Sequence, residues 1–285
     1  MIERIQIQST AWIDAQSPSV DETAQLYRDF GLDSYVADEL PASIERSKVR
    51  FFDTHTYVVL QFPSIEGVTR GGKKCELDFI IGKNFLISVH YEDMVSIKVV
   101  SRDALANPQE YSDPIALFFH IVFKQYRDIG KELEGIDSLI EEAEQEIFES
   151  QDASTVEKIS HINHRILDFK RAMRFHADIW NQLTEKNDSQ FFVRAEAEYH
   201  KLWNALEHYR EITQSLQSTN DSLLSYKTNE VMKFLTVLNF IVLPVAIIPT
   251  ALGLATNNQE RIYVIGFFAL ISLVIYAYFR RKSWF

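Results

Sequence analysis

The pattern of apolar and polar positions separates a mixed first part of the chain from a strongly apolar last part. From Phe234 onward the chain is apolar for about twenty residues, and Ile262–Phe279 is a second run of 18 mostly apolar residues. At a rise of about 1.5 Å per residue, either run can cross a hydrocarbon core of about 30 Å. The pattern therefore predicts two membrane-spanning helices after a water-soluble region of about 230 residues.

One face of the first apolar run is polar or small. Its members recur at spacings of three and four residues, which places them on one side of a helix: Asn229, Met232, Thr236, Asn239, Leu243, Ala246, Thr250 and Gly253. A membrane helix hides such a stripe from lipid, either against neighbouring helices or around water. The stripe predicts a helix that lines an ion pore, and close helix packing is the alternative.

Asn239 favours the pore, because a primary amide in lipid costs several kcal/mol unless it is paired or hydrated. The alternative for Asn239 is a hydrogen bond to a neighbouring helix. Pro244 and Pro249 remove two helical N–H donors, which is tolerable where neighbours or water satisfy the freed carbonyls. The same spacing continues upstream in a series of hydroxyl side chains, Ser215, Ser218, Ser222 and Ser225.

The first 105 residues have the pattern of an α/β domain. Runs rich in β-branched and aromatic residues predict strands at Ile5–Trp12, Val49–Phe62, Glu76–Ile81 and Phe85–Val89. Helices are expected at Ser19–Phe30, which opens with a capping serine and two acids, and at Asp38–Ile44.

Long helical patterns follow Pro114. Two helices are expected at Ile115–Glu149 and Val156–Leu183, and a third begins near Gln190 with no breaker before Pro244. That third helix would run for about 80 Å, which indicates a stalk rather than a compact globule. The acidic run at Glu132–Glu149 is either a solvated helix face or a means of concentrating cations.

Charge and composition narrow the class of protein. The chain has 285 residues and a net charge of −11, which argues against a nucleic-acid partner. The single Cys75 excludes an internal disulfide framework, and no cleavable signal pattern opens the chain. No nucleotide loop or catalytic triad pattern is present, so we expect no enzyme.

Basic residues predict the membrane topology. Lys233 precedes the first span and Arg280-Arg281-Lys282 follows the second, so the positive-inside rule places both termini in the cytoplasm. Two helices of one subunit cannot enclose a pore, so a channel requires a symmetric ring of subunits.

Five blocks, in order along nearly the whole chain, resemble the CorA family of divalent-cation channels: Trp12–Pro18, Phe30–Leu40, Glu76–Glu92, Lys227–Thr236 and Tyr278–Trp284. The resemblance implies a CorA-like funnel, in which an α+β cytoplasmic domain (an α/β sandwich) is followed by long helices and two C-terminal transmembrane helices. It also implies a homopentamer in the inner cell membrane, in contact with lipid, and passive flux of divalent cations. Mg²⁺ is the favoured ion, with Co²⁺, Ni²⁺ and Zn²⁺ as alternatives, and no resident cofactor is expected.

The resemblance assigns roles along the chain. Asn229, Met232 and Leu235 match the family's cytoplasmic pore neck. The implied organisation is a cytoplasmic α/β domain at 1–110, an acidic helical hairpin at 111–189, a stalk helix at 190–232, a pore-lining span at 233–255, an external loop at 256–261, a second span at 262–280 and a cytoplasmic tail at 281–285.

Two positions depart from the family pattern. The outer-mouth triplet Gly-Met-Asn is replaced by Gly253-Leu254-Ala255, which implies altered selectivity. A non-conducting or broadly permeable membrane scaffold or metal sensor is therefore the alternative function. The family's interface aspartate, which senses cytoplasmic metal, is absent from its place, and Glu196 or Glu198 could replace it.

Mg²⁺ holds its six waters tightly and is usually met through that hydration shell. A pore for it needs rings of amide and hydroxyl oxygens, which Asn229, Thr236, Asn239 and Thr250 would supply in a symmetric ring. Apolar constrictions that gate by dewetting would form at Met232, Leu235 and Leu243.

Overall fold

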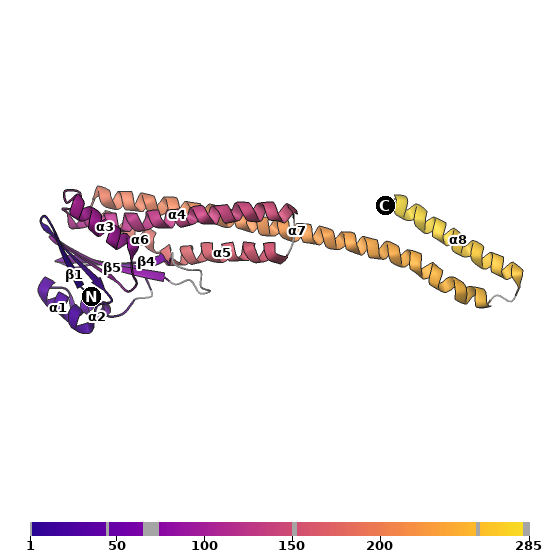
Figure 1. Cartoon of the computed structure of the whole chain (residues 1–285), viewed down its shortest axis with the longest axis horizontal. Helices are drawn as coiled ribbons and strands as arrows, with labels where there is room; N and C mark the ends of the chain where they lie inside the picture. The colour runs from indigo at the N-terminus through magenta and orange to yellow at the C-terminus, as the bar shows by residue number, and fades with distance from the viewer. Residues whose placement is uncertain (1, 44–45, 65–73, 150–152, 255–256, 282–285) are drawn as a thin grey trace. The chain divides into compact units, whose positions relative to one another are not determined.

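The computed structural model describes residues 2–43, 46–64, 74–149, 153–254 and 257–281. The chain divides into two compact units, Met1–Gln217 and Ser218–Phe285. The first unit contains a six-stranded sheet and most of the helices, and the second contains the C-terminal part of one long helix and all of the last one (Figure 1). The predicted mixed α+β domain followed by long helices is confirmed.

The sheet of the first unit has the strand order β1-β2-β6-β5-β4-β3. Its strands are β1 (Ile2–Ile7), β2 (Thr10–Gln16), β3 (Lys48–Phe51), β4 (His55–Pro63), β5 (Lys74–Gly82) and β6 (Phe85–His90). All neighbouring pairs are antiparallel except β2 and β6, which run parallel. The parallel pair joins β2 to β6 along the whole length of β6, so residues about 75 positions apart in the chain meet in the sheet.

Two predicted strands are each a hairpin in the structure. The run Ile5–Trp12 contains a tight turn at Gln8, whose φ of 49° lies in the left-handed region. The run Val49–Phe62 is interrupted between Phe51 and His55, where β3 turns back into β4. Neither turn contains glycine, the residue that usually supplies such a conformation, so the apolar pattern alone concealed both turns.

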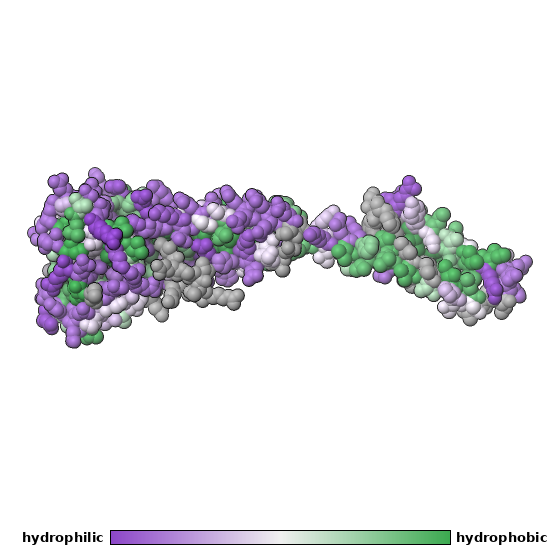
Figure 2. All heavy atoms as spheres, in the orientation of Figure 1, coloured by the Kyte–Doolittle hydropathy of each residue, from purple (hydrophilic) through white to green (hydrophobic). Residues whose placement is uncertain are grey.

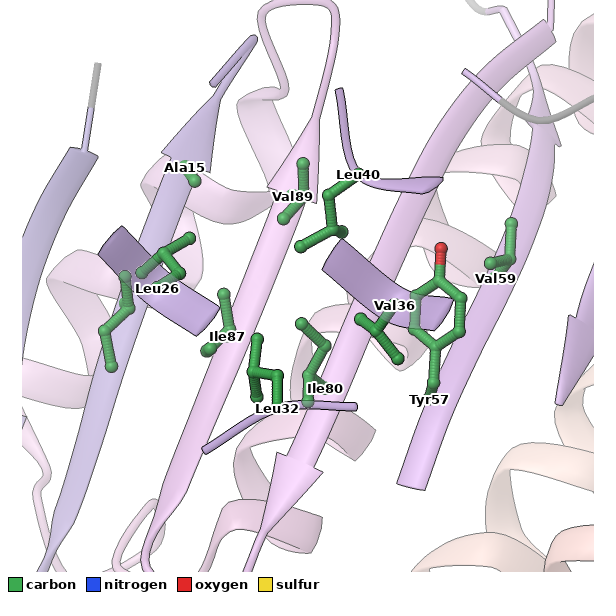
Figure 3. Close-up of a cluster of buried hydrophobic side chains, with 11 residues drawn as sticks. Ala15, Leu26, Leu32, Val36, Leu40, Tyr57, Val59, Ile80, Ile87 and Val89 are labelled. Atoms are coloured by element: carbon green, nitrogen blue, oxygen red, sulfur yellow. The ribbon is translucent and has the colours of Figure 1, made fainter. Parts of the chain in front are cut away.

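Helices α1 (Val20–Phe30) and α2 (Ser34–Glu39) cover one face of the sheet. Ser19 caps α1 in a reciprocal box with Glu22, and Gly31 ends the helix at a φ of 58°. The prediction of Asp38–Ile44 for the second helix was wrong, because Asp33 caps the chain earlier by accepting a hydrogen bond from the Tyr35 amide at 2.9 Å. The two helices and the sheet share a core (Figure 3) that contains Ile13, Ala15, Leu26, Leu32, Val36, Leu40, Tyr57, Val59, Ile80, Ile87 and Val89.

Helices α3 (Val95–Ala106), α4 (Pro114–Glu149) and α6 (His176–Lys186) lie over the other face of the sheet (Figure 1). Phe79 of β5 meets Phe118 of α4 edge to face, with ring centroids 4.8 Å apart. The sequence pattern did not indicate α3, which has no capping side chain at its start.

A buried histidine joins three of these elements. His176 accepts a hydrogen bond at Nδ1 from the Tyr126 hydroxyl, at 2.8 Å, and donates from Nε2 to the Gln61 carbonyl, at 2.9 Å. Trp180 donates to the same Tyr126 oxygen at 2.9 Å. Burial lowers the pKa of His176 to about 3, so the ring is neutral at physiological pH. This arrangement ties β4, α4 and α6 together.

The long helices continue from this layer. The predicted helix Val156–Leu183 is two helices, α5 (Ala153–Met173) and α6, because the chain breaks at Arg174–Phe175 to bury His176. Helix α5 lies against α4, with Lys158 bound to Glu146 at 2.5 Å and Arg165 bound to Glu132 at 3.2 Å. Two acidic side chains of the run on α4 therefore form ion pairs with basic side chains of α5.

Candidate functional site

Helix α7 (Gln190–Leu254) contains the predicted ion pathway. It is 65 residues long and continues through Pro244 and Pro249, ten residues beyond the first expected breaker. Each proline lacks an N–H group, so two carbonyl oxygens one turn earlier are left for other partners. The helix therefore extends the stripe over its full predicted length.

The predicted pore residues face away from the rest of their own chain. The exposed residues among them are Asn229, Met232, Leu235, Asn239, Ala246, Thr250 and Gly253, and Thr236 is partly exposed. Successive helical residues are rotated by about 100°, so the positions spaced by three and four share one face of α7. Ala255 lies outside the described residues, as do the side chains of Leu243 and Leu254.

Hydroxyl groups along this face use their protons within the helix. Thr236 donates to the Met232 carbonyl at 2.7 Å, and Ser222 donates to the Ser218 carbonyl at 2.8 Å. A hydroxyl oxygen whose proton is engaged this way presents only its lone pairs outward. Such oxygens accept hydrogen bonds from water, including the polarised water around a divalent cation.

Many of the other side chains on this part of α7 are exposed and apolar, although Val237 is buried. Phe234 is 67% exposed and Val231 is 57% exposed, and Phe240 and Leu238 are exposed as well. Figure 2 shows hydrophobic side chains over much of the described part of this second unit, with hydrophilic side chains among them. An apolar surface of this extent requires cover by lipid or by other protein chains.

Helix α8 (Asn258–Arg281) has the properties of a membrane span. Its window Arg261–Tyr278 is 18 residues long, has a mean hydropathy of 1.9 and is not buried at all; it is the one such window within the described residues. Arg280 and Arg281 lie in its last turn. Residues 282–285 of the predicted tail lie outside the described residues.

The two candidate metal-sensing carboxylates lie on the first unit's part of α7. Glu196 lies 3.8 Å from His200 Nε2, and Glu198 lies 2.9 Å from Lys201 Nζ. Both side chains are 22% exposed. Across the described residues, no group of three or more His, Cys, Asp or Glu side chains is placed to hold a metal. Each carboxylate therefore has a basic side chain beside it on its own helix.

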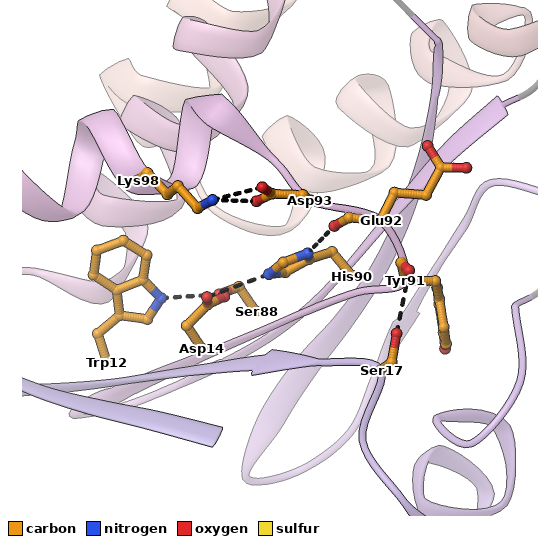
Figure 4. A network of polar contacts seen from close by, with 9 residues as sticks. All are labelled: Trp12, Asp14, Ser17, Ser88, His90, Tyr91, Glu92, Asp93 and Lys98. Carbon is orange, nitrogen blue, oxygen red and sulfur yellow. Dashed lines mark hydrogen bonds and ion pairs between the residues drawn. The ribbon is translucent and has the colours of Figure 1, made fainter. Parts of the chain in front are cut away.

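The sequence pattern did not indicate a polar cluster that lies in the sheet. Asp14, Ser88 and His90 lie on neighbouring strands beneath α3, and Asp14 hydrogen-bonds to both of the others (Figure 4). The available signal was a polar residue at every second position of otherwise apolar strands, such as Ser88 and His90 in Phe85–His90. Strand alternation directs these side chains to one face, but only the parallel β2–β6 pairing brings them to Asp14.

Known proteins similar to this chain include CorA proteins. A family model described as CorA-like Mg²⁺ transporter protein matches residues 8–281. The cobalt/magnesium transport protein CorA of Thermotoga maritima is 20% identical over 274 residues, which cover 90% of this chain and 77% of that protein.

Two solved structures share the fold over nearly the whole chain. The complete CorA magnesium transporter from Methanocaldococcus jannaschii has a TM-score of 0.80 at 20% identity, covering 99% of this chain and 93% of that one. The full-length CmaX protein has a TM-score of 0.81 at 15% identity, covering 95% of this chain and 88% of that one.

The family match covers far more than half of the chain, and its members are membrane transporters rather than enzymes. The predicted family and the prediction that the chain is not an enzyme are confirmed. The chain belongs to the family of CorA-like Mg²⁺ transporter proteins.

Proposed function

We propose that this chain is one subunit of a homopentameric channel that conducts hydrated divalent cations, Mg²⁺ above all, passively across the inner cell membrane. The observation that supports this most is the stripe on α7, where exposed polar and small side chains share one helix face between exposed apolar faces. In a ring of subunits, the stripe would enclose water while the apolar faces meet lipid and neighbouring helices.

The proposed spans are 233–255 and 262–280, joined by an external loop at 256–261. Lys233 and the basic end of α8 then lie on the cytoplasmic side, together with both termini and the sheet-containing unit. Domains 1–110, 111–189 and 190–232 would form the cytoplasmic funnel, in which Glu196 and Glu198 are the candidates for metal sensing.

The proposed pathway selects through hydration water. Amide and hydroxyl oxygens at Asn229, Thr236, Asn239 and Thr250 would accept hydrogen bonds from the waters of the ion, so the ion keeps its tightly held shell. Met232, Leu235 and Leu243 would form apolar constrictions that close by dewetting. Gly253, Leu254 and Ala255 would form an outer mouth without a hydrogen-bonding side chain.

That outer mouth favours a second candidate function, a non-conducting or broadly permeable membrane scaffold or metal sensor. No side chain in Gly253-Leu254-Ala255 can hold the water of a divalent ion before it enters.

Flux measurements separate these functions. We expect liposomes containing the purified protein to take up Mg²⁺ faster than empty liposomes, and to take up K⁺ no faster than empty liposomes. Fluorescent indicators for Mg²⁺, Co²⁺, Ni²⁺, Zn²⁺ and K⁺ provide the readout. Flux of none of the four divalent ions would reject the channel, and equal acceleration of K⁺ and Mg²⁺ would favour the broadly permeable pore.

A further inference from the structure

His90 is a buried histidine whose two ring nitrogens both face oxygen acceptors. It lies at the end of β6 and is 4% exposed. Its Nδ1 lies 2.5 Å from the Glu92 carbonyl oxygen, and its Nε2 lies 3.3 Å from Asp14 Oδ2. A neutral imidazole has one N–H and can satisfy one of these acceptors, whereas the imidazolium has two and satisfies both.

Asp14 faces His90 with Oδ2, and the neighbouring hydrogen bonds make its other oxygen, Oδ1, an acceptor. Trp12 Nε1 can only donate, and it donates to Ser88 Oγ at 2.9 Å. The single Ser88 proton is then directed to Asp14 Oδ1, at 2.6 Å. Asp14 therefore presents a fixed carboxylate to His90 (Figure 4).

Charged groups surround His90 in a cleft of about 530 Å³ between α3 and the β1–β2 edge. Glu3 faces the cleft from β1, Asp93 from the segment before α3, and Lys98 and Arg102 from α3. Lys98 is bound to Asp93 at 2.6 Å, and the neighbour of His90 on β5 is the apolar Leu77. Burial acts to lower the pKa of His90, but the hydrogen bond and charge of Asp14, the Glu92 carbonyl and Asp93 together raise it above its ordinary value.

The ring holds the segment that enters α3. The Tyr91 carbonyl accepts a hydrogen bond from Ser17 at 3.1 Å, and the Glu92 carboxylate accepts one from Cys75 at 3.1 Å. Glu92, Asp93 and Met94 also line a second cleft of about 400 Å³ that reaches Lys124 and Asp128 of α4. The segment is thus a wall between two clefts, and His90 fixes one side of it.

We propose that His90 is a protonation-dependent latch between β2 and the segment entering α3, closed while the imidazole is cationic and released when it loses its proton. Release follows because a neutral ring leaves either the Glu92 carbonyl or the Asp14 carboxylate facing a nitrogen lone pair. The stabilising effect is fully present below pH 6.5 and is lost as the pH rises through the raised pKa of the folded state. The latch would alter both clefts and make this unit sensitive to pH, whether or not the chain conducts ions.

Hydrogen–deuterium exchange of the full chain in detergent tests the latch. After correction for the intrinsic dependence of exchange on pH, we expect peptides covering 91–98 to exchange about tenfold faster at pH 8.5 than at pH 6.0. Peptides from the core of α4, such as 116–122, should show no corrected difference. Equal corrected exchange of peptide 91–98 at both pH values would overturn the proposal.

The variant Asp14→Asn separates a latch from general loosening of the fold. Its carbonyl can still accept from Ser88, and its amide can donate to a neutral His90, so exchange at 91–98 should become independent of pH. The control His161→Gln removes an exposed histidine on α5 and should keep the wild-type pH dependence. Wild-type pH dependence in Asp14→Asn would contradict the proposal.

Discussion

Replacing Asn239 by leucine is expected to lower Mg²⁺ flux through the reconstituted protein by at least about tenfold. In a symmetric ring, the change removes every amide at this level of the stripe and replaces contacts to the ion's hydration water by apolar surface. Raising the free-energy barrier to ion passage by about 1.4 kcal/mol lowers the rate about tenfold. The loss of a single water-mediated hydrogen bond to the hydrated ion has roughly this effect. Indicator fluorescence in liposomes measures the flux.

The matched control is Phe240→Leu, which introduces the same side chain one position further along the helix. Phe240 is exposed on α7 but lies about 100° around the helix from Asn239. We expect its flux to stay within about twofold of wild type. Equal losses in the two variants, with both assembled normally in detergent, would show that Asn239 has no special position in the pathway.

Acid is expected to destabilise the sheet-containing unit through His176. Its pKa is about 3 in the folded protein, below the ordinary 6.5, so the unfolded state binds the extra proton first. The contribution of His176 is fully present above pH 6.5 and is lost as the pH falls towards 3, by at most about 1.4 kcal/mol per pH unit. Urea unfolding of the full chain in detergent between pH 4 and 7 measures this slope.

The variant His176→Gln separates the proton that His176 binds on unfolding from protons bound by other groups. A glutamine amide can still donate to Gln61 and accept from Tyr126, but it does not titrate, so the pH slope should fall by about one proton although stability at pH 7 is lower. His161→Gln, on the exposed side of α5, should keep the full slope. If His176→Gln retains the wild-type slope, another group is responsible for acid unfolding.

The sequence predicted those features whose cause is local. The stripe on α7 follows directly from residue spacing, and the start of α1 follows from Ser19 and Glu22. The long helices follow from stretches without breakers. Helical continuation past Pro244 agrees with the predicted span at 233–255, because a proline removes only one donor while the surrounding helix retains its other hydrogen bonds.

Features that depend on tertiary contacts could not be predicted in the same way. The break before His176 exists because a polar ring is buried against Tyr126 and Gln61, which lie 50 and 115 residues away in the chain. The Asp14–His90 contact spans 76 residues and depends on the parallel β2–β6 pairing. A pattern of alternating residues indicates which face a side chain occupies, but not which strand lies beside it.

Cysteine modification tests most directly whether the stripe on α7 faces a water-filled ion path. In a Cys75→Ser background, Asn239→Cys and Leu238→Cys place a thiol at the same depth on different sides of the helix. A charged, water-soluble methanethiosulfonate should abolish the Mg²⁺ flux that Asn239→Cys retains and leave that of Leu238→Cys unchanged. Flux that is unaffected at Asn239→Cys, or lost only at Leu238→Cys, would show that the stripe does not face the ion path.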